Sequence, residues 1–185
     1  MKELSLNILD IAMNSVKAGA TRISLAIEED GERLCFSVTD DGCGMSADTL
    51  ARVTDPFYTT RKTRKVGLGL PFLKLMAEQT GGCMSITSRA REEHPDDHGT
   101  CTRAEFYKNH IDCLPLGDVI STVITLVQGS PHVALDFRHT LPSGACVRLS
   151  TDEIKAVLGD GIPLDTPDVI LWLRSYLAEQ YSELL

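Results

Sequence analysis

The feature that most constrains the fold is an amphipathic helix pattern followed at once by a β-hairpin pattern. Apolar residues recur every three or four positions over residues 3–18, which predicts a helix with one buried face. Two strand-like runs follow at residues 22–28 and 33–39, and Asp30-Gly31 between them is a strong hairpin turn signal. We therefore expect an α/β fold in which this helix packs on one face of a sheet that contains the hairpin.

The sequence up to residue 107 predicts the remaining elements of a two-layer α/β sandwich with a mixed sheet. In order, they are a short helix at 46–53, a polar and basic loop at 54–66, a second amphipathic helix from about Gly69 to Thr80, and strands at 83–88 and 100–107. The helices that start near Glu3 and Gly69 are expected to cover the same face of the sheet.

Residues 108–185 are predicted to form a second, small α/β unit, because the charge composition changes near Lys108. Helices are expected at 117–128, 152–158 and 168–184, and strands at 132–137 and 145–149. Two roles are open for this unit. It binds a partner protein or a second copy of the chain, or it covers an apolar face of the first domain. The expected domain division is thus 1–107 and 108–185.

Composition argues against several classes of function. No apolar run approaches the ~20 residues that cross a bilayer. The net charge of −8 argues against binding to nucleic acid or to an anionic membrane. The six cysteines form no C-x-x-C pair and no zinc pattern. We expect a soluble cytoplasmic protein with reduced thiols.

The most informative motif is Asp40-Asp41-Gly42-Cys43-Gly44, which lies between a predicted strand and a predicted helix. A carboxylate at a strand end can accept a hydrogen bond from the exocyclic amine of a base, and glycines let the backbone approach a planar ring. By itself, this motif is also typical of an ordinary acidic turn. Its meaning therefore depends on the motifs around it.

Two other patterns point to a phosphate site. Gly67-Leu68-Gly69-Leu70 opens a predicted helix, whose N-terminal N–H groups attract anions. Four cations precede it, namely Arg61, Lys62, Arg64 and Lys65. Asp10 and Asn14 lie one helical turn apart, a spacing that can present one oxygen to Mg²⁺ and another to water. A solvated helix face has the same spacing, so this pair is informative only beside the other motifs.

Together and in this order, the motifs resemble those of the GHKL ATPases, the superfamily of gyrase, heat-shock chaperone, histidine kinase and mismatch-repair ATP-binding domains. The segment ILDIAMNSVKAGATRISLAIEEDGERLCFSVTDDGCGM is similar to the N box and first glycine box in their mismatch-repair form. The segment DPFYTTRKTRKVGLGLPFLK is similar to the F box, lid and second glycine box of histidine kinases, and GGCMSITS with GTCTRAEF to their closing strands and third box. The resemblance covers residues 3–107 and implies a histidine-kinase-like ATPase fold that binds Mg-ATP.

Position by position, the resemblance implies a role for each motif residue. Asn14 would hold Mg²⁺, Asp40 would bind the adenine amine, and Thr100 would lie on the adenine side. The first glycine pair would form the base pocket, and the second would cradle the triphosphate. Arg61 and Lys62 would be lid cations near the terminal phosphate, in a loop that is expected to be mobile without nucleotide. The implied nucleotide-binding set is Asn14, Asp40, Gly42, Gly44, Met45, Gly67, Leu68, Gly69, Leu70 and Thr100.

The sequence leaves two functions open. Asp10 stands where mismatch-repair and gyrase-type members have a glutamate base, and its shorter side chain would hold an attacking water less well. The chain could be a stand-alone ATPase, or a protein kinase towards a separate partner, with Asp10, Arg61 and Lys62 as catalytic candidates. It could instead be a non-hydrolysing module in which ATP orders the lid and the C-terminal unit reports this to a partner or a second copy. None of the five histidines has the setting of a phosphorylated histidine on a helix, so self-phosphorylation is not expected.

Overall fold

The computed structural model describes residues 2–55, 69–159 and 161–184. Its centre is one six-stranded sheet with the order β3-β4-β2-β1-β5-β6, in which β1 and β5 are parallel and the other neighbouring strands are antiparallel. The strands are β1 (Arg22–Glu29), β2 (Arg33–Asp40), β3 (Cys83–Arg89), β4 (Gly99–Tyr107), β5 (Ala134–Thr140) and β6 (Cys146–Ser150). The helices are α1 (Leu4–Lys17), α2 (Ala47–Arg52), α3 (Gly69–Gln79), α4 (Val119–Gly129), α5 (Thr151–Leu158) and α6 (Pro167–Leu184).

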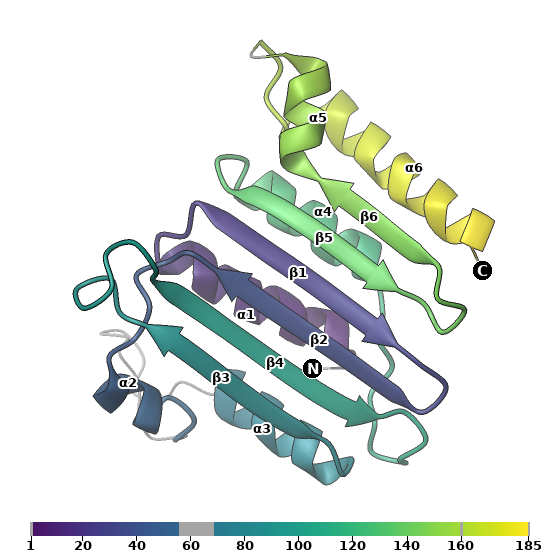
Figure 1. Ribbon diagram of the computed structural model, residues 1–185. Helices are drawn as coiled ribbons and strands as arrows, with labels where there is room; N and C mark the ends of the chain where they lie inside the picture. Colours follow the sequence, from purple (N-terminus) through teal and green to yellow (C-terminus); the bar gives the residue numbers. More distant parts are fainter. Residues whose placement is uncertain (1, 56–68, 160, 185) are drawn as a thin grey trace.

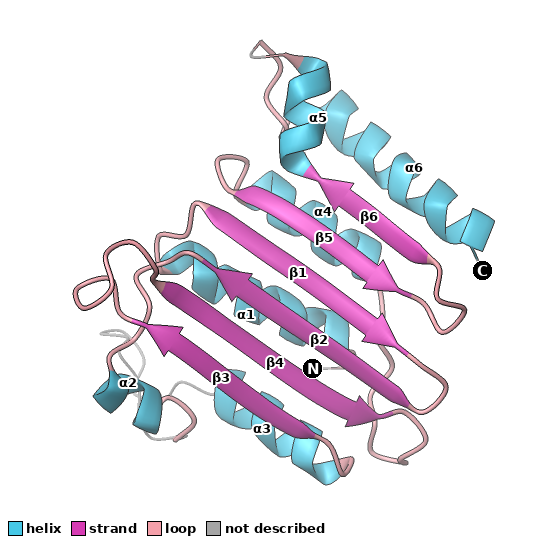
Figure 2. Cartoon of the chain, in the orientation of Figure 1, coloured by secondary structure: helices cyan, strands magenta, loops and turns pink. Residues whose placement is uncertain are grey.

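The helices form the second layer of the molecule. Helices α1, α3 and α4 lie behind the sheet, with α1 between the other two, and α6 lies beside α4 and β6 (Figure 1). Colouring by secondary structure shows the same two layers, and none of the described helices covers the opposite face of the sheet (Figure 2). The predicted two-layer α/β sandwich with a mixed sheet is confirmed. No helix among the described residues has the length and apolar character needed to cross a membrane.

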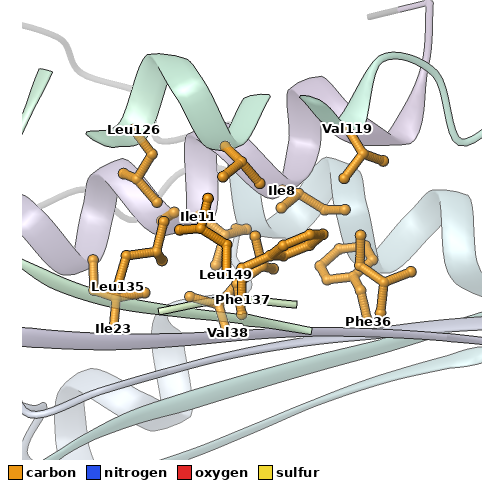
Figure 3. Packing of buried hydrophobic residues seen from close by; sticks show 14 of the residues in the cluster. Ile8, Ile11, Ile23, Phe36, Val38, Val119, Leu126, Leu135, Phe137 and Leu149 are labelled. Atoms are coloured by element: carbon orange, nitrogen blue, oxygen red, sulfur yellow. The ribbon is translucent and has the colours of Figure 1, made fainter. Parts of the chain in front are cut away.

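The core lies between the helices and the inner face of the sheet. Side chains of α1 and α4, such as Ile8 and Leu126, point towards the sheet, from which Phe36 and Val38 of β2 and Phe137 of β5 point back towards the helices (Figure 3). The strands alternate between buried and exposed positions, as a sheet with one covered face requires. Residues from before and after residue 107 thus share one hydrophobic cluster. The division into two domains at that residue stays a prediction.

Two predicted elements of the C-terminal segment differ from the structure by more than one residue at an end. The helix expected at 117–128 begins at Val119, because the Asp118 side chain caps it by accepting from the Ser121 N–H. The strand expected at 132–137 begins at Ala134 and runs on to Thr140, because its last residues pair with both β1 and β6, and His139 is buried there. Apolar periodicity does not reveal a buried histidine, since its polar ring also suits a loop.

Polar contacts fasten the last helix to the sheet. The imidazole of His139 lies between the Tyr181 hydroxyl, 2.8 Å from Nδ1, and a Glu29 carboxylate oxygen, 3.0 Å from Nε2. The hydrogen bond with His139 is the main cause that lowers the pKa of Glu29 below its ordinary value, and Lys108 also lowers it. The side-chain amide of Gln180 bonds the backbone N–H and carbonyl of Arg148 on β6, at 3.0 and 2.9 Å. These contacts join α6 to β1, β5 and β6.

Candidate functional site

A cavity of about 820 Å³ opens between α1, the loop after β2, the start of α3 and the turn that joins β3 to β4. It brings together eight of the residues predicted for the site, namely Asp10, Asn14, Asp40, Gly44, Met45, Gly69, Leu70 and Thr100. Gly67, Leu68, Arg61 and Lys62, with the rest of 56–68, lie outside the described residues, and so does most of the predicted lid.

Asp40 is the last residue of β2 and reaches across to α1. Its Oδ2 accepts a hydrogen bond from the Ser15 hydroxyl at 2.5 Å, and its Oδ1 accepts one from the Gly42 N–H at 2.9 Å. A carboxylate has about four lone-pair positions, so each oxygen keeps capacity for a further donor. The two bonds fix the carboxylate in place, and it can accept a hydrogen bond from a ligand in the cavity.

The neighbouring Asp41 serves the fold and does not line the cavity. Its carboxylate accepts from the backbone N–H groups of Thr21 and Arg22, at 2.7 and 2.8 Å, and from the Thr21 hydroxyl. Burial acts to raise the pKa of Asp41, but these hydrogen bonds outweigh it, and the pKa lies below its ordinary value. The two adjacent aspartates therefore face different partners, and only Asp40 is available to a ligand.

Two glycines let the loop after β2 pass close to its neighbours. A Cβ on Gly42 would lie 2.9 Å from both the Ala18 Cβ and Asp40 Oδ1. Gly44 has a φ of +65°, and a Cβ there would lie 1.8 Å from the Arg89 carbonyl oxygen. A side chain at Gly44 would therefore both strain the backbone and collide with β3. Gly42 holds the Asp40 carboxylate through its N–H, whereas Gly44 lines the cavity.

At the Asp40 end, β4 lines the cavity through Thr100 and Thr102. Thr100 lies directly opposite Asp40 in the β2–β4 pairing. Its hydroxyl is 2.8 Å from the Ser88 hydroxyl, which also accepts from the Met45 N–H at 2.8 Å. A chain of hydroxyl groups thus connects the loop after β2 to β4 in the cavity wall.

At its other end, the cavity is lined by α1 and by the start of α3. Asp10 and Asn14 lie one turn apart on α1 and both line the cavity. Helix α3 begins at Gly69, so close to α1 that a Cβ there would lie 2.3 Å from Asp10 Oδ2. Glycine allows this approach without a shift of the Asp10 carboxylate, and the start of α3 lies beside that carboxylate. Helix N-termini favour phosphate groups.

The same end also fits a magnesium ion. Carboxylate and amide oxygens are ligand types that Mg²⁺ takes together with substrate phosphates, and Asp10 and Asn14 supply them. No group of three or more His, Cys, Asp or Glu side chains in the described ranges could hold a metal by itself. These residues therefore suit an ion held largely by a bound phosphate, and the role of Asn14 as its ligand stays a prediction.

Several residues that line the cavity were missed by sequence reasoning. They are Ile11, Ser15, Lys17, Ala18, Cys43, Ser46, Thr49, Val53, Ala90, Arg91, Glu92 and Thr102. Lys17 could have been found, since it lies on the polar face of the first helix three residues after Asn14. Arg91 and Glu92 had no such signal, because they belong to a charged turn with no recognisable pattern.

Residues 1–110 match the family described as histidine kinase-, DNA gyrase B- and HSP90-like ATPase. The chain is 34% identical over 84 residues to the sensor histidine kinase ZraS of Escherichia coli K12, covering 44% of this chain and 18% of that protein. It is 35% identical over 85 residues to sporulation kinase E of Bacillus subtilis, covering 45% of this chain and 11% of that kinase. The chain therefore spans less than a fifth of the length of these two kinases.

Solved structures resemble this chain over a longer range. The N-terminal domain of a DNA repair protein superposes with a TM-score of 0.56 at 16% identity, over 87% of this chain and 58% of that one. The Aquifex aeolicus MutL ATPase domain complexed with ADP superposes with a TM-score of 0.55 at 12% identity, over 85% of this chain and 69% of that one. The shared fold therefore extends beyond residue 107, where the sequence resemblance stopped. This chain belongs to the histidine kinase-, DNA gyrase B- and HSP90-like ATPase family.

Proposed function

We propose that this chain binds Mg-ATP in the cavity and acts as a stand-alone ATPase or as a protein kinase towards a separate partner. The observation that carries the proposal is the fixed Asp40 carboxylate at one end of the cavity, with Asp10 and Gly69 at the other and Asn14 between them along α1. Ser15, which bonds Asp40, follows Asp10 by five residues, or ~7.5 Å along a helix. This separation suits a base at one end and phosphates at the other.

Each end of the cavity offers the groups that its part of ATP needs. Asp40 accepts from the adenine amine, and Thr100 contacts the same side of the base. Asn14 holds Mg²⁺, which would neutralise phosphate charge, while the N-terminus of α3 from Gly69 binds the phosphates. Phosphoryl transfer needs mainly such positioning and charge stabilisation. The ADP named for the MutL structure fits a nucleotide in this fold.

Whether the terminal phosphate is consumed separates the two kinds of function. Asp10 is the candidate base, and Arg61 and Lys62 are the candidate lid cations. The matches to sensor and sporulation kinases favour phosphotransfer to a partner, and the MutL likeness favours hydrolysis. The alternative is an ATP-gated module without turnover, which the short Asp10 side chain favours because it reaches less far than glutamate. In each case residues 108–185 would contact a partner protein or a second copy of the chain, or would only cover an apolar face of the ATP-binding domain.

We also propose that the protein acts in the cytoplasm. All six cysteines are free thiols in the structure, as expected of a reducing compartment. ATP and Mg²⁺ are both plentiful in such a compartment.

The proposal is tested by mixing the protein with Mg²⁺ and γ-labelled ATP, with and without cell extract. Free labelled phosphate indicates hydrolysis, and a labelled protein band in the extract indicates a kinase. Binding without either product indicates the gated module. An Asp40→Asn variant controls for contaminating enzymes, because a signal that comes from this cavity should fall as binding weakens, whereas the signal of a contaminant should not. No ATP binding by the folded wild-type protein would refute the proposal.

A further inference from the structure

The turn that joins β3 to β4 folds over the glycine loop that follows β2. The Arg91 N–H donates to the Cys43 carbonyl at 2.9 Å, and His98 Nδ1 is 2.7 Å from the Gly42 carbonyl oxygen. Ala90, Arg91 and Glu92 of this turn line the cavity. The turn is therefore part of the cavity wall, a role that none of the sequence motifs indicated.

The hydrogen bonds define the state of the His98 ring. A carbonyl oxygen only accepts, so Nδ1 of His98 carries the proton that is donated to Gly42. Arg91 Nε–H lies 3.2 Å from His98 Nε2, and a guanidinium only donates, so Nε2 accepts. Both ring nitrogens of His98 are thus hydrogen-bonded, one as a donor and one as an acceptor. It holds the Arg91 guanidinium on one side and the glycine loop on the other.

The position of Arg91 along the cavity follows from the backbone. The Cys43 carbonyl accepts from Arg91, and the Cys43 N–H donates to the Ala18 carbonyl at 2.9 Å. Ala18 follows Asp10 by eight residues, which is ~12 Å along the axis of α1. Arg91 therefore lies towards the Asp40 end of the cavity and away from the Asp10 end, where phosphate would bind.

We infer that Arg91 is a further nucleotide-binding residue, which contacts the base end of the ligand, and that His98 is its positioning residue. The inference rests on the proposed binding of ATP. A guanidinium is planar and stacks on aromatic rings, and the face of an adenine ring is such a surface. Holding the guanidinium through His98 reduces the side-chain freedom that binding has to remove. The site therefore takes a nucleotide whose base is held by a carboxylate and by a cation.

The inference is tested by titration calorimetry with ATP, ADP and AMP on wild-type protein and variants. Arg91→Ala should weaken all three nucleotides by a similar factor, about three- to thirtyfold, because they share the base. Arg91→Lys keeps the charge without the planar group and should fall between wild type and Arg91→Ala. Arg89→Ala is the matched control and should bind as wild type does. Arg89 is two residues away, pairs with Asp97, and does not line the cavity.

A double-mutant cycle tests the role of His98. His98→Ala should weaken binding in the wild-type background, and should weaken it less in the Arg91→Ala background, because it acts in part through Arg91. A purely structural role would give equal factors in both backgrounds. Thermal unfolding confirms that each variant is folded.

Three outcomes overturn the inference. Affinities of Arg91→Ala equal to those of the wild type would remove Arg91 from the site. A loss that grows from AMP to ATP would place Arg91 at the phosphates. If folded wild-type protein binds none of the three nucleotides, the proposed function itself fails, and this inference fails with it.

Discussion

Asp40→Asn should separate ligand binding from folding. The substitution keeps the shape of the side chain but removes its charge and replaces one oxygen by an amide NH2. The Gly42 N–H can only donate, so the amide oxygen of the asparagine has to remain beside it. The NH2 group then faces Ser15, whose hydroxyl can turn and accept. Both contacts within the protein are therefore kept.

The expected magnitudes follow from this geometry. In the folded protein, charged hydrogen bonds are only replaced by neutral ones, which lowers the free energy of unfolding by about 0.5–1 kcal/mol. The adenine amine loses a charged acceptor inside the cavity, which costs about 1–3 kcal/mol. This loss corresponds to an increase of about 5- to 140-fold in the Kd for ATP.

The assay combines calorimetric titration of ATP with urea unfolding, and Asp41→Asn serves as the matched control. Asp41 bonds Thr21 and Arg22 and does not line the cavity, so its substitution should reduce stability by about 1 kcal/mol and leave the Kd unchanged. The two variants should thus lose similar amounts of stability, and only Asp40→Asn should raise the Kd for ATP. An unchanged Kd in Asp40→Asn, or an equal increase in both variants, would refute the assignment of Asp40 to the base.

Three further outcomes are expected. Gly44→Ala should lower the unfolding temperature by several degrees in a thermal melt, because φ is +65° and the new Cβ would lie 1.8 Å from the Arg89 carbonyl oxygen; an unchanged melt would contradict this. Folding lowers the pKa of Glu29 from its ordinary value of 4.5. The ionised carboxylate therefore stabilises the fold fully above pH 4.5, and this stabilisation disappears as the pH falls through the lower pKa of the folded state. The free energy of unfolding in urea should therefore fall less for Glu29→Gln than for wild type when the pH is lowered from 5 to more acidic values. Truncation after Tyr107 should give an aggregating fragment, since β1 loses its partner β5 and α1 loses α4; a soluble fragment that binds ATP would instead favour a separate C-terminal unit.

Local patterns predicted the elements of the fold well, but not how the last strands join it. The helix over 3–18 and the hairpin around Asp30-Gly31 follow from periodicity and turn chemistry, and the structure has both. The parallel pairing of β5 with β1 joins residues more than a hundred positions apart. Such a pairing depends on packing between segments that are distant in the sequence. The apolar pattern of these strands would be the same if they formed a separate small sheet. For this reason the sequence left the arrangement of residues 108–185 open.

Prediction of the site from the sequence was limited in the same way. Asp40 and Gly44 belong to a contiguous motif whose spacing carries chemistry, so they were found without the structure, although their roles stay predictions. Arg91 and His98 lie in a charged turn, and only the folding of that turn onto the glycine loop brings Arg91 to the cavity and His98 to the Gly42 carbonyl. The predicted lid with Arg61 and Lys62 lies outside the described residues.

The contact between Gln180 and Arg148 has a consequence for assembly. The short strand β6 ends the sheet, and an exposed edge strand offers its unpaired N–H and carbonyl groups as a template for a strand from another molecule. Arg148 is the middle residue of β6, and Gln180 occupies both of its outward backbone groups, as a seventh strand would. Growth of the sheet across this edge would first require α6 to leave. A dimer of this chain with α6 in place therefore cannot form by pairing strands at Arg148 of β6.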